Sequence, residues 1–295
     1  MRARAISETP AASVIVSTYN WPEALSLVLD SLRYQTRRDF EVIVADDGSK
    51  QETRDLIRRF ALESGLAVKH FWQQDDGFRP SRSRNGAVSL AEGGYLIFVD
   101  GDCCLLPDFV ASHLALAEPG WFVAGRRCYL KRGMTERIFR RSLAHYRWPK
   151  ALWFLLALTG QSNRPFQFVG LPVSDSKRKR RADKWEKVQT CNLGVWRKDF
   201  IAVDGFDISY EGHGMEDSDF VLRLIRAGLG RKDADHTSPV LHLFHPRRDS
   251  TTADGVHPNA ARFQALMDCE RKLSVRGLAD TIAEAASSDD AVQTV

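Results

Sequence analysis

The stretch Tyr95-Leu-Ile-Phe-Val-Asp-Gly-Asp102 decides the fold of this 295-residue chain. Its first five residues form an apolar run that is typical of a buried strand. Two aspartates separated by one glycine follow directly. In an open α/β sheet, ligands bind beyond the carboxyl ends of the strands, which is where these aspartates would lie. The stretch therefore predicts a buried strand that ends at a ligand-binding edge.

Two earlier runs repeat this arrangement. Ser13–Ser17 is followed by Thr18-Tyr19-Asn20, and Glu41–Ala45 is followed by Asp46-Asp47. Helical patterns alternate with these runs and with a further strand at 68–72; they cover residues 22–35, 51–64 and 81–91. Strands that alternate with helices imply parallel crossover connections, so we expect an α/β fold with a doubly wound, mostly parallel sheet. Three strands would then deliver polar groups to one edge.

The pattern changes after Pro107. We expect, in chain order, a helix at 108–117, a strand at 122–124, an amphipathic helical stretch at 135–158, an irregular segment at 160–188, a strand from 190, a helix at 216–227 and a strand at 239–244. The domain organisation that follows is a flexible N-terminus (1–10), one domain (11–265) whose residues 126–188 form a basic, Trp-rich insertion, and a C-terminal helix and tail (266–295), disordered beyond Gly277.

Composition narrows the cellular setting. No apolar run approaches the roughly 20 residues that a membrane-spanning helix needs, since the longest, Ala151–Leu158, has eight. The first ten residues lack the apolar core of a secretory signal, which favours the cytoplasm. The five cysteines show neither a disulfide framework nor a zinc-ligand spacing. We therefore expect a cytoplasmic protein, peripheral to the inner face of the plasma membrane.

The peripheral contact is inferred from the basic insertion. Residues 126–181 contain 15 Lys or Arg and two acidic residues, a local charge of +13, whereas the whole chain carries +4. Aromatic residues such as Trp153 lie near Arg140 and Arg141, and the run Lys177–Arg181 adds further charge. This combination suits an anionic membrane interface. A partly buried helix with a solvated basic face is an equally good interpretation, and nucleic acid is not expected because no nucleic-acid motif accompanies the charge.

The aspartates at the strand ends suggest two kinds of chemistry. Asp100 and Asp102 can offer oxygens to a hard divalent cation, and Gly101 would leave room for a phosphate ligand. An ordinary Asp-Gly turn is the alternative. Of Asp46 and Asp47, one is expected to cap the following helix, which leaves the other free to accept hydrogen bonds from a nucleobase or ribose.

Two later segments add candidates for catalysis and for metal binding. Gly212-His-Gly-Met-Glu-Asp217 is a Gly-rich turn that runs into an acidic helix start. Acidic residues are common there because of the helix dipole, but glycines beside a carboxylate pair also suit a closing loop that brings in a general base. His242 and His245 end or follow the last predicted strand, so one of them is a candidate metal ligand.

Taken together, these segments resemble bacterial family 2 glycosyltransferases, which have the GT-A (nucleotide-diphospho-sugar transferase) fold. The end of the chain resembles a galactosyltransferase C-terminal motif that chondroitin-polymerase-type enzymes share. The resemblance covers residues 12 to 263 and rests on an ordered series: Val14–Asn20, Val42–Ser49, Asp76–Arg79, Arg84–Gly86, Phe98–Asp102, Cys191-Asn192, Gly205–Asp207, Gly212–Asp217 and His242–His245.

The resemblance implies roles for individual residues. It implies a uridine pocket lined by Thr18, Asp47, Asp76 and Arg84. The full nucleotide-binding set, with Asp46 and Asn85 in support and Asp100 nearer the ribose or sugar, is Thr18, Asn20, Asp46, Asp47, Asp76, Arg84, Asn85 and Asp100. For the metal it implies Asp102 as a direct ligand, His245 as the better match to the family's histidine and His242 as its substitute. It implies Asp217 as the catalytic base and Glu216 as a contact to the acceptor or donor sugar.

The function expected from this resemblance is inverting, metal-dependent transfer of a hexose or N-acetylhexosamine. The donor would be a UDP-sugar with Mn2+ or Mg2+, and the acceptor a glycan or lipid-linked glycan of the cell envelope, such as lipopolysaccharide or capsule. His213 stands where the family usually has Trp, so the identity of the acceptor does not carry over. A nucleotidyltransferase and a non-catalytic, membrane-associated partner in glycan assembly are the alternatives.

Overall fold

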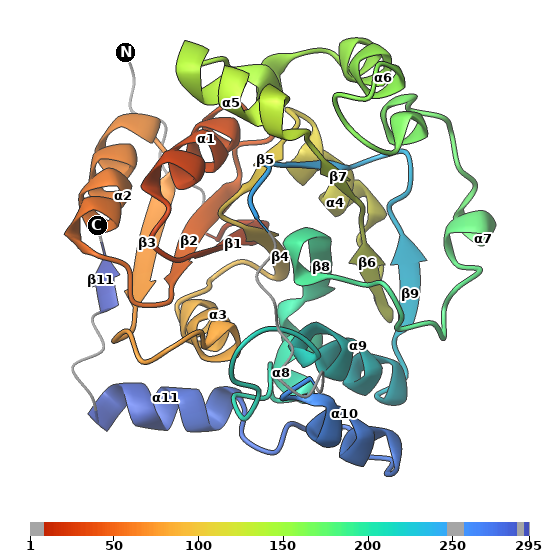
Figure 1. The fold of residues 1–295 in the computed structure, drawn as a ribbon. Helices are drawn as coiled ribbons and strands as arrows, with labels where there is room; N and C mark the ends of the chain where they lie inside the picture. The colour runs from red at the N-terminus through yellow and green to blue at the C-terminus, as the bar shows by residue number, and fades with distance from the viewer. Residues whose placement is uncertain (1–8, 247–256, 288–291, 295) are drawn as a thin grey trace.

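A sheet of eight strands forms the centre of the computed structural model, which describes residues 9–246, 257–287 and 292–294 (Figure 1). Four neighbouring strands run parallel, as the sequence predicts: β3 (Ala67–Trp72), β2 (Phe40–Asp46), β1 (Ala12–Thr18) and β4 (Tyr95–Asp100). The sheet continues from β4 through β8 (Leu193–Trp196), which is antiparallel, to β6 (Trp121–Ala124) and β9 (Gly230–Asp233). At the other edge β11 (Val292–Thr294) pairs with β3.

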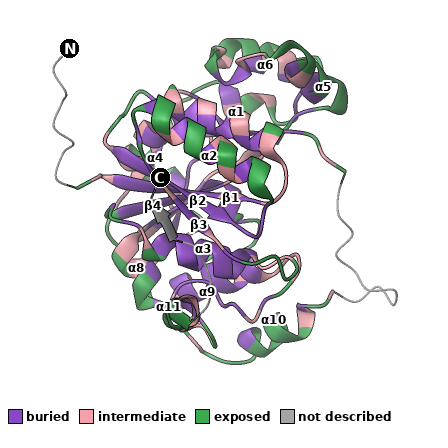
Figure 2. Cartoon of the chain, turned by 90° about the vertical axis from the view of Figure 1, so that its left-hand side faces the viewer, coloured by how far each residue is buried: buried purple, intermediate pink, exposed green. Residues whose placement is uncertain are grey.

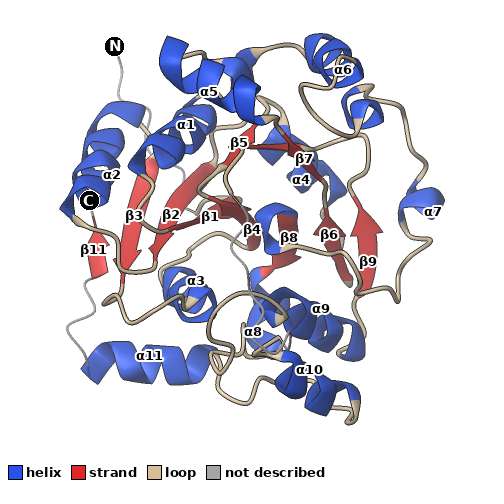
Figure 3. Ribbon diagram, in the orientation of Figure 1, coloured by secondary structure: helices blue, strands red, loops and turns tan. Residues whose placement is uncertain are grey.

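Helices cover both faces of this sheet (Figures 2 and 3). Successive strand residues face opposite sides, so Val14 and Val16 of β1 belong to one apolar core and Ile15 belongs to the other. The first core includes residues of α1 (Pro22–Arg33), α2 (Gln51–Ser64) and α4 (Phe109–Leu116). The second includes residues of α3 (Pro80–Ser89), α8 (Arg197–Ala202) and α9 (Glu216–Arg226), and α10 (Ala260–Met267) packs beside α9.

A second, three-stranded sheet joins distant parts of the chain. It consists of β5 (Cys103–Leu105), β10 (Val240–His242) and β7 (Arg127–Tyr129), with β10 in the middle. The register places His242 opposite Cys103, the residue that follows Asp102. Strand pairing therefore brings a histidine from near residue 240 to the end of β4.

The predicted helical stretch at 135–158 is wrong as one unit. The structure has α5 (Arg132–Arg141) and α6 (Lys150–Leu158), separated by a short 3-10 turn, η1 (His145–Arg147). Ser142 adopts a left-handed conformation (φ 46°) that ends α5, and Pro149 begins α6. Trp153 is fully buried against η2 (Pro165–Phe168), so it is unavailable to a membrane. Between η2 and β8 the chain contains the short helices α7 (Asp175–Arg178) and η3 (Thr190–Asn192).

The expectation of disorder beyond Gly277 is also wrong for residues 278–287. They form α11 (Leu278–Ser287), which packs against α3. Thr281 is fully buried and accepts a hydrogen bond from the Asn85 amide (3.2 Å), and Glu284 accepts one from Arg82 (3.1 Å). The Ala- and Ser-rich composition hid a helix that tertiary contacts stabilise. The predicted flexible N-terminus falls mostly on residues 1–8, outside the described residues.

No helix in the described ranges is long and apolar enough to cross a bilayer.

Candidate active site

The three predicted strand ends meet at one edge of the sheet. The register pairs Thr18 at the end of β1 with Asp46 at the end of β2, and it pairs Ser17 with Asp100 of β4. Gly101 then passes so close to β1 that its amide donates a hydrogen bond to the Ser17 carbonyl (2.7 Å). A Cβ on Gly101 would lie 2.8 Å from that carbonyl oxygen. Close backbone approach, rather than room for phosphate alone, therefore requires this glycine.

Asp102 lies beside both candidate histidines. Its Oδ2 is 3.3 Å from Nε2 of His245 and 3.5 Å from Nε2 of His242, so one carboxylate and two imidazoles converge. Burial raises the pKa of Asp102, but the hydrogen bond from His245 and the two nearby imidazoles outweigh this and leave the pKa below its usual value. Burial lowers the pKa of His242 to about 4. A neutral imidazole offers a lone pair, so this donor set can hold a divalent cation.

Asp217 lies at the start of α9 and is fixed by Thr190. The Thr190 hydroxyl donates a hydrogen bond to Oδ1 (2.7 Å) and its backbone N–H donates one to Oδ2 (3.1 Å). The carboxylate remains 23% exposed, so a substrate can reach it. The neighbouring Glu216 is buried, and desolvation together with the charge of Asp217 raises its pKa to about 7. The two adjacent carboxyl groups therefore differ in environment.

Arg84 connects the strand-end aspartate to this pair. Its guanidinium is 3.5 Å from Asp100 and 3.6 Å from both Glu216 and Asp217. Burial lowers the pKa of Arg84, but the surrounding carboxylates outweigh it and raise the pKa above its usual value. Burial has the opposite effect on the carboxyl group of Asp100 and raises its pKa to about 6. The guanidinium thus offsets the mutual repulsion of three carboxyl groups.

Asp47 occupies a separate corner of the same edge. Its Oδ1 accepts a hydrogen bond from the Gln73 side chain (2.5 Å), and its Oδ2 accepts one from the Arg79 backbone N–H (2.7 Å). Burial raises the pKa of Asp47 to about 6. Asp46 is fully buried, accepts a hydrogen bond from the Ser49 N–H (2.8 Å) and contacts His70 (3.1 Å). Asp46 therefore shapes the turn before α2, and contact between Asp47 and a nucleotide stays a prediction.

Three other predicted nucleotide-binding residues make structural contacts. The Asp76 side chain is 78% exposed and pairs with Arg79 (3.0 Å). Asn20 accepts a hydrogen bond from the Lys50 N–H at the start of α2 (2.9 Å). Asn85 is fully buried and bonds both backbone groups of Phe206 (2.8 and 2.9 Å). The structure does not bring these three side chains to the carboxylate cluster, and their contact with a nucleotide stays a prediction.

Residues that the sequence did not single out complete the site. Thr190 immediately precedes the Cys191-Asn192 pair, which was the available signal for it. Arg127 lies 3.9 Å from Asp100, and no local pattern marks it. His213, in the turn before α9, stacks on Phe78 with ring centroids 4.1 Å apart. At the position where the resemblance implies Trp, the chain therefore still has a ring that contacts an aromatic side chain.

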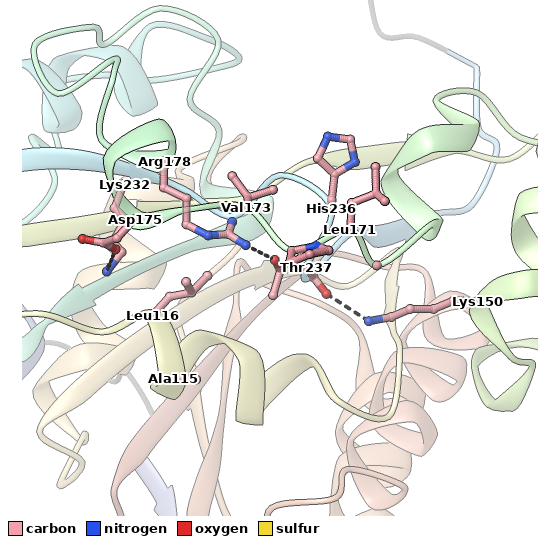
Figure 4. Close-up of a pocket in the computed structure, with 12 residues that line it drawn as sticks. Ala115, Leu116, Lys150, Leu171, Val173, Asp175, Arg178, Lys232, His236 and Thr237 are labelled. Carbon is pink, nitrogen blue, oxygen red and sulfur yellow. Dashed lines mark hydrogen bonds and ion pairs between the residues drawn. The ribbon is translucent and has the colours of Figure 1, made fainter.

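A hollow of about 430 Å3 lies elsewhere, between α4, α6 and α7 (Figure 4). The basic side chains that line it already contact other residues of the protein. Lys150 and Arg178 both donate hydrogen bonds to Thr237, and Lys232 forms an ion pair with Asp175. None of the candidate site residues lines it. The carboxylate edge, and not this hollow, is the candidate active site.

Comparison with known proteins identifies the family of the chain. The family model described as glycosyl transferase family 2 matches residues 13–172, more than half of the chain, and one described as the N-terminal domain of galactosyltransferase matches residues 173–246. The validoxylamine A glucosyltransferase of Streptomyces hygroscopicus subsp. jinggangensis is 33% identical over 76% of this chain and 54% of that protein. The chondroitin synthase of Escherichia coli is 37% identical over 35% of this chain and 15% of that protein.

Solved structures share the fold. Residues 1–349 of Staphylococcus aureus TarS in complex with UDP-GlcNAc align with a TM-score of 0.54 and 18% identity, over 87% of this chain and 64% of that one. The mannosyltransferase PcManGT of Pyrobaculum calidifontis, in complex with GDP-Man and Mn2+, aligns with a TM-score of 0.56 and 18% identity, over 98% and 79%. The chain spans about half the length of the validoxylamine A glucosyltransferases that it matches. It belongs to glycosyl transferase family 2 and has the GT-A fold.

Proposed function

We propose that this glycosyltransferase moves a hexose or N-acetylhexosamine from a UDP-sugar to a cell-envelope glycan, with a divalent cation and with inversion at the anomeric carbon. One observation carries the proposal: Asp217 and the Asp102–His242–His245 cluster lie at the same strand edge, joined through Arg84 and Asp100. A single displacement needs a base for the attacking hydroxyl and positive charge for the leaving diphosphate. Asp217 can supply the base, and a cation held by the Asp102–His242–His245 cluster can supply the positive charge.

Asp217 would act as the base. Thr190 holds both carboxylate oxygens, which fixes the orientation of the group while leaving it accessible. It takes the proton of the acceptor hydroxyl as the hydroxyl oxygen bonds to the anomeric carbon. The bond between that carbon and the diphosphate oxygen breaks at the same time, so the configuration inverts. Arg84 keeps the neighbouring carboxyl groups together without a large electrostatic cost.

The cation would be held by Asp102, His242 and His245. One carboxylate with two imidazoles suits Mn2+ better than Mg2+, which prefers oxygen ligands and bound water. When bound, the cation supplies positive charge beside the leaving diphosphate. The Mn2+ in the PcManGT complex supports the choice of metal.

Asp47 and Thr18 would bind the nucleobase side of the donor. Asp47 is buried at the strand edge, and a carboxylate there can accept a hydrogen bond from the N3–H of uracil. The UDP-GlcNAc complex of TarS supports uridine. The GDP-Man complex of PcManGT shows that the fold also accepts guanosine, so the base must be tested.

The acceptor would lie against His213, in the turn that leads to Asp217, and Phe78, whose ring contacts that of His213. A lipid-linked glycan is supported by a Campylobacter jejuni relative, 27% identical over 42% of this chain, whose name gives it an undecaprenol-linked acceptor. Transfer at the cytoplasmic face of the membrane fits that acceptor.

Release of UDP from a panel of UDP-sugars, with Mn2+ or with EDTA, tests the proposal. We expect one donor to be hydrolysed slowly with Mn2+ and not with EDTA, because water can replace an absent acceptor. GDP-mannose serves as the matched control for the base. Hydrolysis of the GDP-sugar alone would contradict the uridine assignment, and turnover undiminished by EDTA would contradict the metal.

The structure divides the basic insertion into two parts. One part is paired within the protein, through Lys179 with Glu118, Arg181 with Asp233 and Arg126 with Asp235. The other is the exposed side of α5, where Arg137, Arg140 and Arg141 make no ion pair with any described residue. The run Lys177–Arg181 is therefore a poorer candidate for lipid binding than the sequence suggests, and α5 is a better one.

Exposed apolar side chains lie in the next helices. Leu155 and Leu158 of α6 are 57% and 58% exposed, and Phe166 of η2 is 63% exposed. Phe154 and Phe166 are in ring contact, so α6 and η2 share one surface. We propose that this α5–α6 face, defined by Arg137, Arg140, Arg141, Leu155, Leu158 and Phe166, rests on an anionic membrane. The exposed apolar side chains suit the apolar boundary of a membrane, and the arginines suit its anionic head groups.

Replacing Arg137, Arg140 and Arg141 with Gln tests this contact. Each arginine near an anionic surface contributes about 1 kcal/mol, so vesicle binding should fall roughly a hundredfold. The measurement is co-sedimentation with phosphatidylglycerol vesicles at low and high salt. Arg58→Gln/Arg59→Gln on the exposed side of α2 is the matched control and should bind normally. Equal binding by both variants, or none by the unaltered protein, would contradict the proposal.

A further inference from the structure

Two cysteines lie beside the active site and have no part in the proposed chemistry. Cys103 begins β5 and Cys191 lies in η3; both are buried. Their Sγ atoms and a carboxylate oxygen of Asp100 all lie within 4.8 Å of one another. The two cysteines are 88 positions apart in the sequence, so no spacing motif announces the cluster.

Two thiols and a carboxylate form a donor set that differs from that of the neighbouring cluster. Thiolates select soft or borderline cations such as Zn2+ and Cd2+, whereas the harder cations Mn2+ and Mg2+ favour ligands other than sulfur. In a tetrahedral zinc site with Zn–S bonds of about 2.3 Å, two sulfurs are roughly 3.8 Å apart. The three atoms are therefore already close to a chelating arrangement. A fourth position would be open to water.

The cluster touches both halves of the catalytic apparatus. Cys103 follows Asp102 and its thiol donates a hydrogen bond to that carboxylate (3.3 Å). Cys191 follows Thr190, which holds Asp217. Asp100 faces Arg84 (3.5 Å) and Arg127 (3.9 Å), so a cation that recruits Asp100 must weaken both contacts. A cation bound at this cluster would therefore shift Asp102, Asp217 and the Arg84 guanidinium together.

We infer that Cys103, Cys191 and Asp100 form a thiophilic cation site whose occupation by Zn2+ or Cd2+ inhibits transfer. The site adjoins the Asp102–His242–His245 cluster but shares no side chain with it. Binding at this site does not depend on the proposed function. Inhibition rests on it, because it is measured as loss of sugar transfer.

Binding is tested by titrating the 295-residue chain with Cd2+ and recording thiolate-to-cadmium charge-transfer absorbance. The exposed Cys269 is first replaced by Ala to remove a competing thiol. We expect one Cd2+ per chain, with the absorbance of two thiolates. Cys103→Ser or Cys191→Ser should each weaken binding at least roughly tenfold. Cys128→Ser, a buried cysteine outside the cluster, and Asp102→Asn should bind normally.

Two results would overturn the site. The first is a Cys269→Ala protein whose cadmium absorbance corresponds to one thiolate or none. This result overturns the site even if a serine variant fails to fold. Unchanged binding in folded Cys103→Ser and Cys191→Ser proteins would do so as well.

Inhibition is then measured as UDP release with saturating Mn2+ and increasing Zn2+. The inhibitory Zn2+ concentration should rise at least roughly tenfold in Cys191→Ser and stay unchanged in Cys128→Ser. Equal inhibition of both variants would place the inhibitory zinc at the Asp102 cluster and overturn the inference. If no UDP is released under any condition, the proposed function fails, and the Cd2+ titration still decides whether the site exists.

Discussion

Asp217→Asn is expected to lower the rate of sugar transfer by roughly 10²- to 10⁴-fold while changing donor affinity little, because a positioned general base contributes about that much. Asparagine has nearly the size of aspartate but cannot take the acceptor proton. The contacts that hold Asp217 come from Thr190, whereas Asp47 is held by Gln73 and the Arg79 N–H, so the donor pocket should survive the change. Single-turnover transfer measures the rate, and calorimetry with the nucleotide measures affinity.

Glu211→Gln is the matched control for this prediction. It makes the same chemical change at an exposed position in the same turn, six residues earlier. Its rate should stay within about twofold of the unaltered protein. Thr190→Val removes the hydroxyl contact to Asp217 and keeps the backbone N–H contact, so a smaller loss is expected. Equal loss of rate and donor affinity in Asp217→Asn would remove this residue from the base role.

Asp102→Asn is expected to lower Mn2+ affinity by at least roughly 10- to 100-fold, since even partners outside the ligand set contribute that much. Transfer at a fixed Mn2+ concentration should fall by roughly 10²- to 10³-fold, the usual effect of removing one group that stabilises developing charge. The variant keeps the shape of the side chain but loses the negative charge between His242 and His245. Electron paramagnetic resonance of free Mn2+ gives the affinity directly.

Asp55→Asn, on the exposed side of α2, is the control and should bind Mn2+ as the unaltered protein does. His242→Ala and His245→Ala then show which imidazole contributes more. A normal Mn2+ affinity in Asp102→Asn would mean that the cluster is not the metal site. Normal affinity in both histidine variants would instead leave Asp102 as a ligand and remove the imidazoles.

The strand edge was readable from sequence because each of its strands is a short apolar run with a polar end. The runs that end at Asp46 and Asp100 are fully or almost fully buried, so their composition reports their position. The approach of His242 and His245 to Asp102 was not readable from residue patterns alone. It depends on pairing between β5 and β10, which are separated by 134 residues of chain. The residue pattern indicated only that one of the two histidines could be a metal ligand, and the resemblance to a family paired them with Asp102.

The less accurate expectations have a common physical cause. Asn20, Asp46 and Asn85 occur in the motifs, but their polar atoms are used by backbone groups that only the folded chain brings near. The basic run at 177–181 looked free because all but one of its acidic partners lie more than 50 residues away, as Arg181 and Asp233 show. Local patterns carry no information about such pairings.

The packing of α11 on α3 has a consequence for synthesis on the ribosome. Helix α3 carries Arg84, and its far side is closed only when Thr281 and Glu284 reach Asn85 and Arg82. A nascent chain that has emerged only to Gly277 therefore presents an uncovered apolar and polar surface beside Arg84. During cotranslational folding this side of α3 stays uncovered until α11 has emerged. We therefore expect a chaperone to bind the nascent chain at this surface.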